Sequence, residues 1–257
     1  EALKTRPKDV GSSGDVPDTF LKKAVAQLGV LPKLMEALEG RDAKAAKKTD
    51  GAKTTAVRGV PKLSDAALAG TKDSIKCTLI LTEGDSAKTM ALSGLSSEQR
   101  RNWGVFPLRG KLINPKEAAL AKVHANAEVE ALKKILGLKV GATYTDARAL
   151  RYGRIVVMTD QDLDGSHIRG LLLNLFHALW PQLLQVRGFL TFMATPLLKI
   201  VSGPHSGLAF YSAQGFRAWL ADAEAEEPSL RARVKYYKGL GTSTSAEKPW
   251  VVSSIWS

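Results

Sequence analysis

The segment "VVMTDQDLDGSHI" (residues 156–168) joins a short apolar run to three aspartates at alternate positions. Continuous apolar runs rich in β-branched residues are typical of strands that are buried on both faces of a parallel sheet. The runs 154–158, "RIVVM", and 77–81, "CTLIL", both have this character. Each precedes a segment with helical spacing of its apolar residues, 166–180 and 86–93 respectively. This alternation predicts an α/β fold built on a parallel sheet.

Four carboxylates are expected at one edge of that sheet. Asp160, Asp162 and Asp164 follow the strand 154–158, and Glu83 follows the other strand by two residues. Open α/β sheets place their ligand sites at the carboxyl ends of the strands. In extended backbone, residues two apart point to the same side, roughly 6–7 Å from each other. Such a cluster raises its own pKa values unless a cation binds, and oxygen ligands favour a hard ion such as Mg²⁺.

Other interpretations of the acidic segment compete with a metal site. One is a surface patch of aspartates that binds nothing. An EF-hand calcium loop shares the D-x-D-x-D-G pattern, but its twelfth position would be Leu171 instead of Glu, and a strand precedes it. Haloacid-dehalogenase-type phosphotransferases also follow a strand with D-x-D. Their fifth residue is usually Thr or Val where this chain has Asp164, and they stay a weak alternative.

The composition favours a polyanionic partner. The 257 residues include 37 Lys and Arg against 25 Asp and Glu, a formal net charge of +12, which suits nucleic acid or an anionic membrane. Apolar stretches are interrupted well short of the roughly 20 residues of a membrane span, so no membrane partner is expected. The single cysteine, Cys77, is expected to be buried, and a reducing compartment fits. Because the sequence begins with Glu1 rather than Met, we expect a piece of a larger protein.

The rest of the chain alternates between predicted helices, strands and one basic linker. Residues 19–39 predict two short helices or one broken helix, and residues 41–62 predict the linker. Ser86 is expected to cap a helix. Further predictions are a helix over 118–137, a strand leading into a helix over 209–227, and a strand over 233–239.

Four motifs occur in a specific order: "LTEGDSAK" (81–88), "GVFPLRGK" (104–111), "TDQDLDGSHI" (159–168) and "KYYKGLGTSTS" (235–245). Together they resemble the DNA cleavage core of a eukaryotic-type DNA topoisomerase II. The resemblance implies a Toprim domain with insertions over 63–248, a Rossmann-like parallel sheet with helices on both faces. Residues 1–62 resemble the helical C-terminal part of the ATPase transducer region with its basic linker. Residues 249–257 diverge from the family pattern.

The resemblance also implies roles for individual residues. Glu83 matches a metal ligand that is proposed as general acid or base, and Asp160 and Asp162 match the metal-binding pair. Asp164 matches the third acid. The implied ion is Mg²⁺, with Mn²⁺ or Ca²⁺ as substitutes. Arg109 and Lys111 are expected to act in catalysis, because cations beside the reacting phosphate stabilise developing negative charge. The implied DNA contacts are Arg109, Lys111, Asn114, Lys238, Lys47 and Lys48.

For the parent protein, the resemblance implies an ATP-dependent type II topoisomerase that changes DNA topology by transient double-strand breakage. Its partner is double-stranded DNA, it works as a homodimer in the nucleus, and ATP binds outside this chain. An organellar or viral parent stays open. No segment here resembles the domain that carries the nucleophilic tyrosine, so this chain alone is expected to be inactive. Two alternatives are a truncated, non-catalytic DNA-binding or assembly module and a Toprim primase or nuclease, against which "PLRGK" and "KGLGTSTS" speak.

Overall fold

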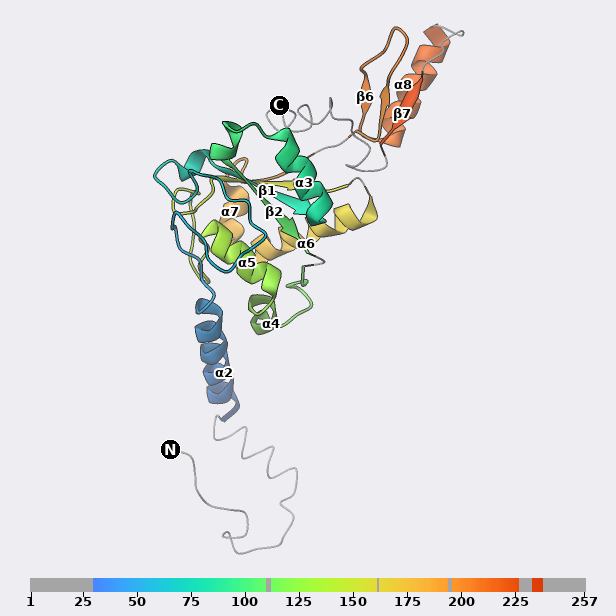
Figure 1. Cartoon of the computed structure of the whole chain (residues 1–257). Coiled ribbons are helices and arrows are strands. Elements are labelled where there is room, and N and C mark those ends of the chain that lie inside the picture. The colour runs from blue at the N-terminus through green and yellow to red at the C-terminus, as the bar shows by residue number, and fades with distance from the viewer. Residues whose placement is uncertain (1–29, 110–111, 161, 194–195, 227–232, 238–257) are drawn as a thin grey trace, which may run out of the picture. The chain divides into compact units, whose positions relative to one another are not determined.

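The computed structural model of the chain describes residues 30–109, 112–160, 162–193, 196–226 and 233–237 (Figure 1). The chain divides into two compact units, Glu1–Ala45 and Ala46–Ser257. In the described ranges, no helix is both long and apolar enough to span a membrane.

Helix α2 (Val30–Lys47) corrects the prediction for the start of the chain. Residues 41–47 were predicted as linker, but they continue the helix, because alanine and lysine are strong helix formers. Pro32 lies in the first turn, where the missing backbone N–H disrupts no helical hydrogen bond. Residues 19–29 of the predicted helical segment lie outside the described residues.

The main sheet has four parallel strands in the order β2-β1-β3-β4. The strands are β1 (Thr78–Glu83), β2 (Trp103–Leu108), β3 (Arg154–Met158) and β4 (Leu190–Phe192). The two strands predicted from the apolar runs are therefore β1 and β3, and they pair directly. The helices that join the strands are α3 (Gly84–Gly94), α4 (Leu120–His124), α5 (Ala127–Leu136), α6 (Leu163–Leu179) and α7 (Pro181–Gln185), with short 3-10 turns at Ser74–Lys76 and Gln99–Arg101.

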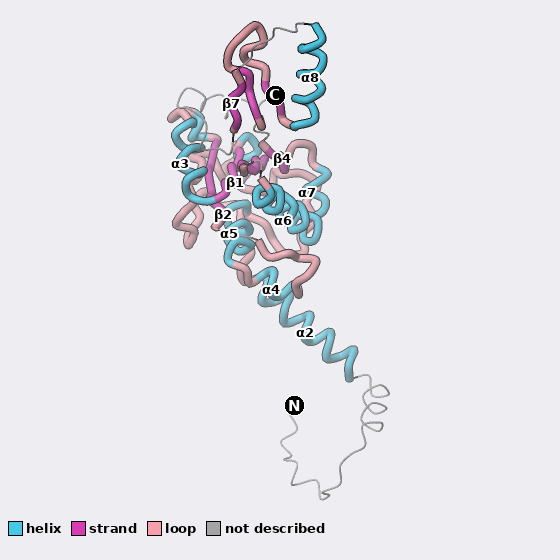
Figure 2. The backbone as a smooth tube through the Cα atoms, turned by 90° about the vertical axis from the view of Figure 1, so that its right-hand side faces the viewer, coloured by secondary structure: helices cyan, strands magenta, loops and turns pink. Residues whose placement is uncertain are grey.

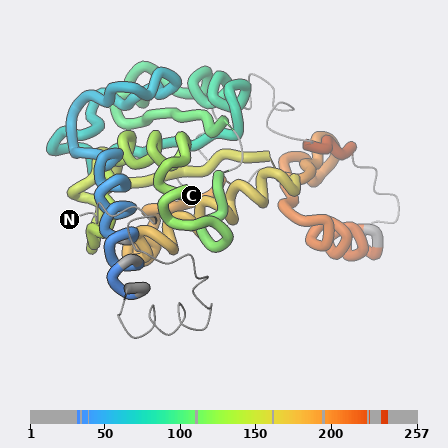
Figure 3. The backbone as a smooth tube through the Cα atoms, turned by 90° about the horizontal axis from the view of Figure 1, so that it is seen from below, coloured from blue at the N-terminus to red at the C-terminus, as the bar shows by residue number. Residues whose placement is uncertain are grey.

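Both faces of this sheet are covered by helices, as predicted for a Rossmann-like fold (Figure 2). Ile80, Val156 and Met158 pack with residues of α3 in one core cluster. Their neighbours along the strands, such as Leu81 and Val157, pack in a second cluster with residues of α5 and α6. Figure 3 shows α5 in green and α6 in yellow to orange on the same side of the sheet. Burial on both faces explains why the strands read as continuous apolar runs.

Two helices begin or break where a polar side chain caps the backbone. Residues 118–137 form α4 and α5 instead of one helix, because the side chain of Asn126 accepts hydrogen bonds from the N–H groups of Glu128 and Val129. Helix α6 starts at Leu163, three residues earlier than predicted, because Asp162 caps it. Ser86 was predicted to cap α3 but lies inside it, and the N-cap position belongs to Glu83.

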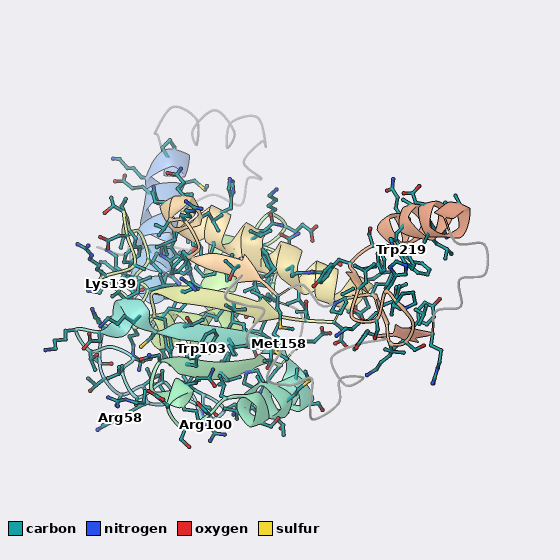
Figure 4. All side chains as sticks on the ribbon, turned by 90° about the horizontal axis from the view of Figure 1, so that it is seen from above. Arg58, Arg100, Trp103, Lys139, Met158 and Trp219 are labelled. Carbon is teal, nitrogen blue, oxygen red and sulfur yellow. The ribbon has the colours of Figure 1, made fainter. Side chains whose placement is uncertain are left out.

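A second, smaller sheet is antiparallel and has the order β6-β5-β7. Its strands are β5 (Leu198–Ile200), β6 (Ala209–Phe210) and β7 (Val234–Tyr236), and helix α8 (Ala213–Glu226) follows β6. The strand and helix predicted over 209–227 and the strand predicted over 233–239 correspond to β6, α8 and β7. The aromatic rings of Phe210 in β6 and of Phe216 and Trp219 in α8 pack together. Figure 4 labels Trp219 in this small unit.

Candidate metal centre

The pairing of β1 with β3 places Glu83 beside the start of the acidic segment. Thr82 pairs with Met158, so Glu83, the last residue of β1, lies at the level of Thr159, one residue before Asp160. A hydrogen bond from the backbone of Asp160 reaches the Glu83 carboxylate. The expectation that the two strand ends are neighbours is therefore confirmed.

Glu83 is in an environment that disfavours an isolated negative charge. Burial raises the pKa of its carboxyl, and the negative charges of Asp162, Asp160 and Asp164 raise the pKa further, while the Asp160 backbone hydrogen bond opposes the rise. The Oε2 atom of Glu83 is buried and has no hydrogen-bond partner among the described residues. Since buried polar atoms are normally satisfied, this orphaned carboxylate oxygen fits a hard cation bound at the edge of the sheet.

The three aspartates do not all continue in extended backbone, which corrects the predicted alternation. Asp162 is extended, but α6 begins at Leu163, so Asp164 lies in the first helical turn. The Oδ1 atom of Asp162 accepts a hydrogen bond from the Gly165 N–H at 2.8 Å. Within the described ranges, no three His, Cys, Asp or Glu side chains converge closely enough to hold one metal ion. The set of Glu83, Asp160, Asp162 and Asp164 as metal ligands therefore stays a prediction.

A glycine fixes the path of the acidic segment over the end of β3. A Cβ atom added at Gly165 would lie 2.2 Å from the backbone oxygen of Asp160 and 3.0 Å from the side chain of Thr159. Only glycine allows the first turn of α6 to approach this backbone so closely. The D-G pair in the sequence thus positions Asp160 relative to the helix.

Arg109 follows the third strand that reaches this edge. Leu108, the last residue of β2, pairs with Glu83, so Arg109 lies just beyond the same edge of the sheet. The backbone N–H of Arg109 donates to the Oε1 atom of Glu128, at the start of α5, over 3.3 Å. The exposed guanidinium of Arg109 also lowers the pKa of Asp85, although the larger effect there is the hydrogen bond from Lys62. Lys111 lies outside the described residues.

Glu128 is a site residue that the sequence reasoning missed. Burial raises the pKa of its carboxyl, and the hydrogen bond from the Arg109 backbone together with the charges of Arg109 and Lys62 opposes the rise. Its Oε2 atom is buried without a hydrogen-bond partner among the described residues. The only signal in the sequence is an acid in the first turn of a helix, which is too common to indicate a contact with Arg109.

The predicted DNA contacts fall on three different segments. Lys47 and Lys48 are exposed at the end of α2, beside Thr49 and Asp50, which both contact the buried Nζ of Lys133. The side chain of Asn114 accepts a hydrogen bond from the N–H of Lys116, so it stabilises a turn in this structure. Lys238 lies outside the described residues. These DNA contacts stay predictions.

Comparison with known families and proteins agrees with this geometry. Residues 78–194 match the Toprim domain family, and residues 193–255 match the family described as the C-terminal associated domain of TOPRIM. The chain is 46% identical over 247 residues to DNA topoisomerase 2 of Pisum sativum, covering 96% of this chain and 17% of the relative. It is 44% identical over 251 residues to DNA topoisomerase 2-alpha of Homo sapiens, covering 96% of this chain and 16% of the relative.

The chain therefore contains a Toprim domain and its C-terminal associated domain, and it is homologous to eukaryotic DNA topoisomerase 2 over 96% of its length. This Toprim chain spans about one sixth of the length of these curated relatives. A crystal structure of the DNA-binding, cleavage and re-ligation domain of Plasmodium falciparum topoisomerase II superposes with a TM-score of 0.71 at 44% identity. That match covers 79% of this chain and 27% of the other. The domain limits predicted at residues 62 and 248 stay a prediction beside the matched ranges.

Proposed function

We propose that this Toprim chain is the Mg²⁺-binding half of the DNA cleavage and religation site of an ATP-dependent type II topoisomerase. Its parent would act on double-stranded DNA as a nuclear homodimer and would use ATP at a site outside this chain. The observation that carries the proposal is the buried Oε2 atom of Glu83, which has no hydrogen-bond partner among the described residues. The charges of three aspartates act on this carboxyl at the carboxyl edge of a parallel sheet.

The acids at the sheet edge would bind the ion, and one of them would act as a general acid or base. Glu83 and Asp160 would contribute the ligands from β1 and β3, with Asp162 turning one oxygen to the ion while the other caps α6. Asp164 would add negative charge from the first turn of α6. When bound, Mg²⁺ supplies Lewis-acid stabilisation of charge on the phosphate and the leaving oxygen. Burial and the neighbouring aspartates raise the pKa of the Glu83 carboxyl when no cation is bound, and Glu83 would act as general acid or base toward this oxygen.

The cations beside these acids would hold the DNA phosphates. Arg109 lies beyond the end of β2, and its backbone is held by Glu128, so its side chain would stabilise negative charge on the phosphate that reacts. Lys111, Asn114 and Lys238 would add contacts from the segments that follow β2 and β7, and Lys47 and Lys48 would contact duplex further along. The attacking tyrosine would come from a part of the parent outside this chain.

Metal titration tests this proposal on the chain itself. We expect isothermal titration with Mg²⁺, and with Mn²⁺ as a spectroscopic substitute, to show saturable binding. Glu83→Gln and Asp160→Asn should each weaken binding about 100-fold or more, because each removes a charged ligand. Asp146→Asn is the control, since Asp146 pairs with Arg148 away from the acidic segment. Unchanged affinity in Glu83→Gln would contradict the proposal and would favour a DNA-binding or assembly module without catalysis.

A further inference from the structure

We infer that Thr159 is a positioning residue of the proposed metal centre, whose hydroxyl donates a hydrogen bond to the Glu83 carboxylate when an ion is bound. The inference rests on the proposed function for the ion, Mg²⁺, and it assigns a role to a side chain that is not itself a ligand. Thr159 directly follows Met158, the last residue of β3, which Figure 4 labels. It precedes Asp160, whose backbone forms a hydrogen bond with the Glu83 carboxylate.

The hydroxyl of Thr159 is buried and lacks a partner. The residue is 2% exposed, and its Oγ1 atom has no hydrogen-bond partner among the residues that the structure describes. Buried polar atoms are normally satisfied, because an unmade hydrogen bond leaves the loss of hydration uncompensated. The hydroxyl of Thr82 in β1 follows this rule and donates to the backbone oxygen of Gly84 over 3.1 Å. The hydroxyl of Thr191 in β4 likewise donates to the backbone oxygen of Ile155 over 3.1 Å.

Helix α6 does not need the Thr159 hydroxyl. A Cβ atom placed at Gly165 would be 3.0 Å from Oγ1 of Thr159, so the hydroxyl lies against the first turn of α6. Asp162 already caps that turn, since its Oδ1 atom accepts a hydrogen bond from the Gly165 N–H and its backbone oxygen accepts one from the Ser166 hydroxyl. A valine would fill the same space without an unpaired polar atom. The hydroxyl is therefore not explained by packing or by capping.

Glu83 offers the complementary group on the neighbouring strand. The parallel register of β1 with β3, continued by one residue beyond Met158, makes Glu83 and Thr159 a pair at the strand spacing of about 4.8 Å. Leu81 and Val157, two residues earlier, both pack in the core cluster that contains residues of α6, so alternation directs Glu83 and Thr159 to that same face. The Oε2 atom of Glu83 is likewise buried without a partner among the described residues. A hydroxyl that can donate thus lies beside a carboxylate that can accept.

Ion binding gives these two groups a reason to pair. Without a cation, the charges of three aspartates act on the Glu83 carboxyl and disfavour its negative charge. Once an ion offsets these charges, one oxygen of Glu83 serves as a ligand. The other oxygen turns to accept from the Thr159 hydroxyl, because the terminal torsion of a glutamate side chain is soft. Carboxylates that bind metals are commonly held by such hydrogen bonds, which fix the orientation of the ligand.

Three variants of the full chain test the inference by isothermal titration with Mg²⁺. Thr159→Val keeps the shape of the side chain and removes the hydroxyl, so it should weaken Mg²⁺ binding about tenfold. Thr159→Ser keeps the hydroxyl and should bind within about twofold of the wild type. Thr191→Val is the control, because it removes a hydroxyl that bonds to the Ile155 backbone near the start of β3. Its Mg²⁺ affinity should equal that of the wild type.

Thermal melting without metal separates this role from a structural one. Replacement of an unpaired buried hydroxyl by a methyl group should leave the melting temperature of Thr159→Val equal to or above that of the wild type. Thr191→Val should melt at a lower temperature, because it loses a hydrogen bond that is made. Weaker Mg²⁺ binding by Thr159→Val then cannot be attributed to unfolding. The opposite order of the two melting temperatures would assign the Thr159 hydroxyl a structural role and overturn the inference.

A double variant shows whether Thr159 acts through Glu83. Because Glu83→Ala removes the group that the hydroxyl orients, Glu83→Ala/Thr159→Val should bind Mn²⁺ no more weakly than Glu83→Ala alone. A further loss in the double variant would overturn the inference. Wild-type affinity in Thr159→Val, or an equal loss in Thr159→Ser and Thr159→Val, would also overturn it. Failure of the proposed function would appear differently, as unchanged Mg²⁺ affinity in Glu83→Gln.

Discussion

The two sheets of this chain expose different parts of themselves to a partner. In the parallel sheet, Leu79, Ile80 and Leu81 of β1 are each 0% exposed, and helices cover both faces. Only the ends of its strands are left to carry chemistry, and there the chain places Glu83 and the aspartates. In the antiparallel sheet, Leu198 and Ile200 of β5 are buried, and Lys199 between them is half-buried.

The comparison teaches that the way a sheet is covered decides where its polar side chains can lie. A strand end buried between layers concentrates carboxylates in a setting that raises the pKa of Glu83 and suits a cation. The antiparallel sheet instead places polar residues such as Lys199 and Lys235 between the hydrophobic residues of its strands. Stability measurements can break this comparison. They test whether the stability of the parallel sheet depends on buried polar contacts, and whether that of the antiparallel sheet does not.

The largest effect is expected from the buried ion pair under the parallel sheet. Arg151 has 0% exposure, and it donates to Asp65 Oδ2 at 2.5 Å and to the backbone oxygens of Thr54 and Ile135. Asp65→Ala should lower the free energy of unfolding by about 3 kcal/mol, because it leaves a buried charge without its partner. Urea unfolding measures this, and the exposed pair Lys76 with Asp73 is the control. A loss no larger than that of Asp73→Ala would show that the burial is not decisive.

The antiparallel sheet should depend instead on its aromatic cluster. Trp219 packs against Phe210, Phe216 and His205, and it is only partly buried. Trp219→Ala should cost roughly 2 kcal/mol, less than truncation of a fully buried tryptophan. Amide hydrogen exchange should accelerate in β5 and β7 and stay slow in β1 and β3. Tyr211→Ala, at an exposed position, is the control. Equal acceleration of amide exchange in both sheets would contradict the expectation that the two sheets are stabilised independently.

Two glycines of helix α6 provide a matched test of the site at the strand ends. Gly165→Ala puts a Cβ atom 2.2 Å from the Asp160 backbone, and it should cost about 1–2 kcal/mol while weakening Mg²⁺ binding. Gly170→Ala, also in α6, meets nothing within 4 Å and should be neutral or stabilising by up to about 1 kcal/mol. Thermal melting with and without Mg²⁺ distinguishes them. Equal behaviour of the two variants would mean that Gly165 does not shape the site.

The smallest effect concerns a buried histidine beside α5. Burial lowers the pKa of His124, and the charge of Lys133 lowers it further while Asp50 opposes. Below the ordinary value of 6.5, the unfolded chain therefore binds more protons than the folded chain, so stability falls as the pH falls from 6.5 through the lower folded pKa. His124→Gln should flatten this dependence in melting curves between pH 7.5 and 5. The exposed His177→Gln is the control, and a wild-type slope in His124→Gln would contradict the assignment.

The sequence predicted the parallel sheet where its strands are buried on both faces and failed where another rule applied. The runs 77–81 and 154–158 are recognisable as β1 and β3, but β2 contains Gly104 and Pro107 and was missed as a strand. Pro107 is tolerated because β2 is an edge strand of the sheet. Gly104 leaves room for the ring of Tyr152. Neither reason can be read locally.

The acidic site was predicted in composition but not in detail. The neighbourhood of Glu83 and Asp160 follows from strand order, which the alternation of strands and helices favours. The capping of α6 by Asp162 overrides the two-residue alternation and moves Asp164 into a helix. The contact of Glu128 with the Arg109 backbone joins residues 19 apart in the chain, and no spacing rule indicates it.

The central claim is that Glu83 and Asp160, from two adjacent strand ends, share one ion. Anomalous scattering from a crystal of the chain grown with Mn²⁺ tests it most directly. The account predicts a single strong peak with carboxylate oxygens of Glu83 and Asp160 at about 2.0–2.2 Å, within the range of hard-ion ligation. A peak bound by other residues, or a Glu83 side chain directed away from the ion, would contradict the account.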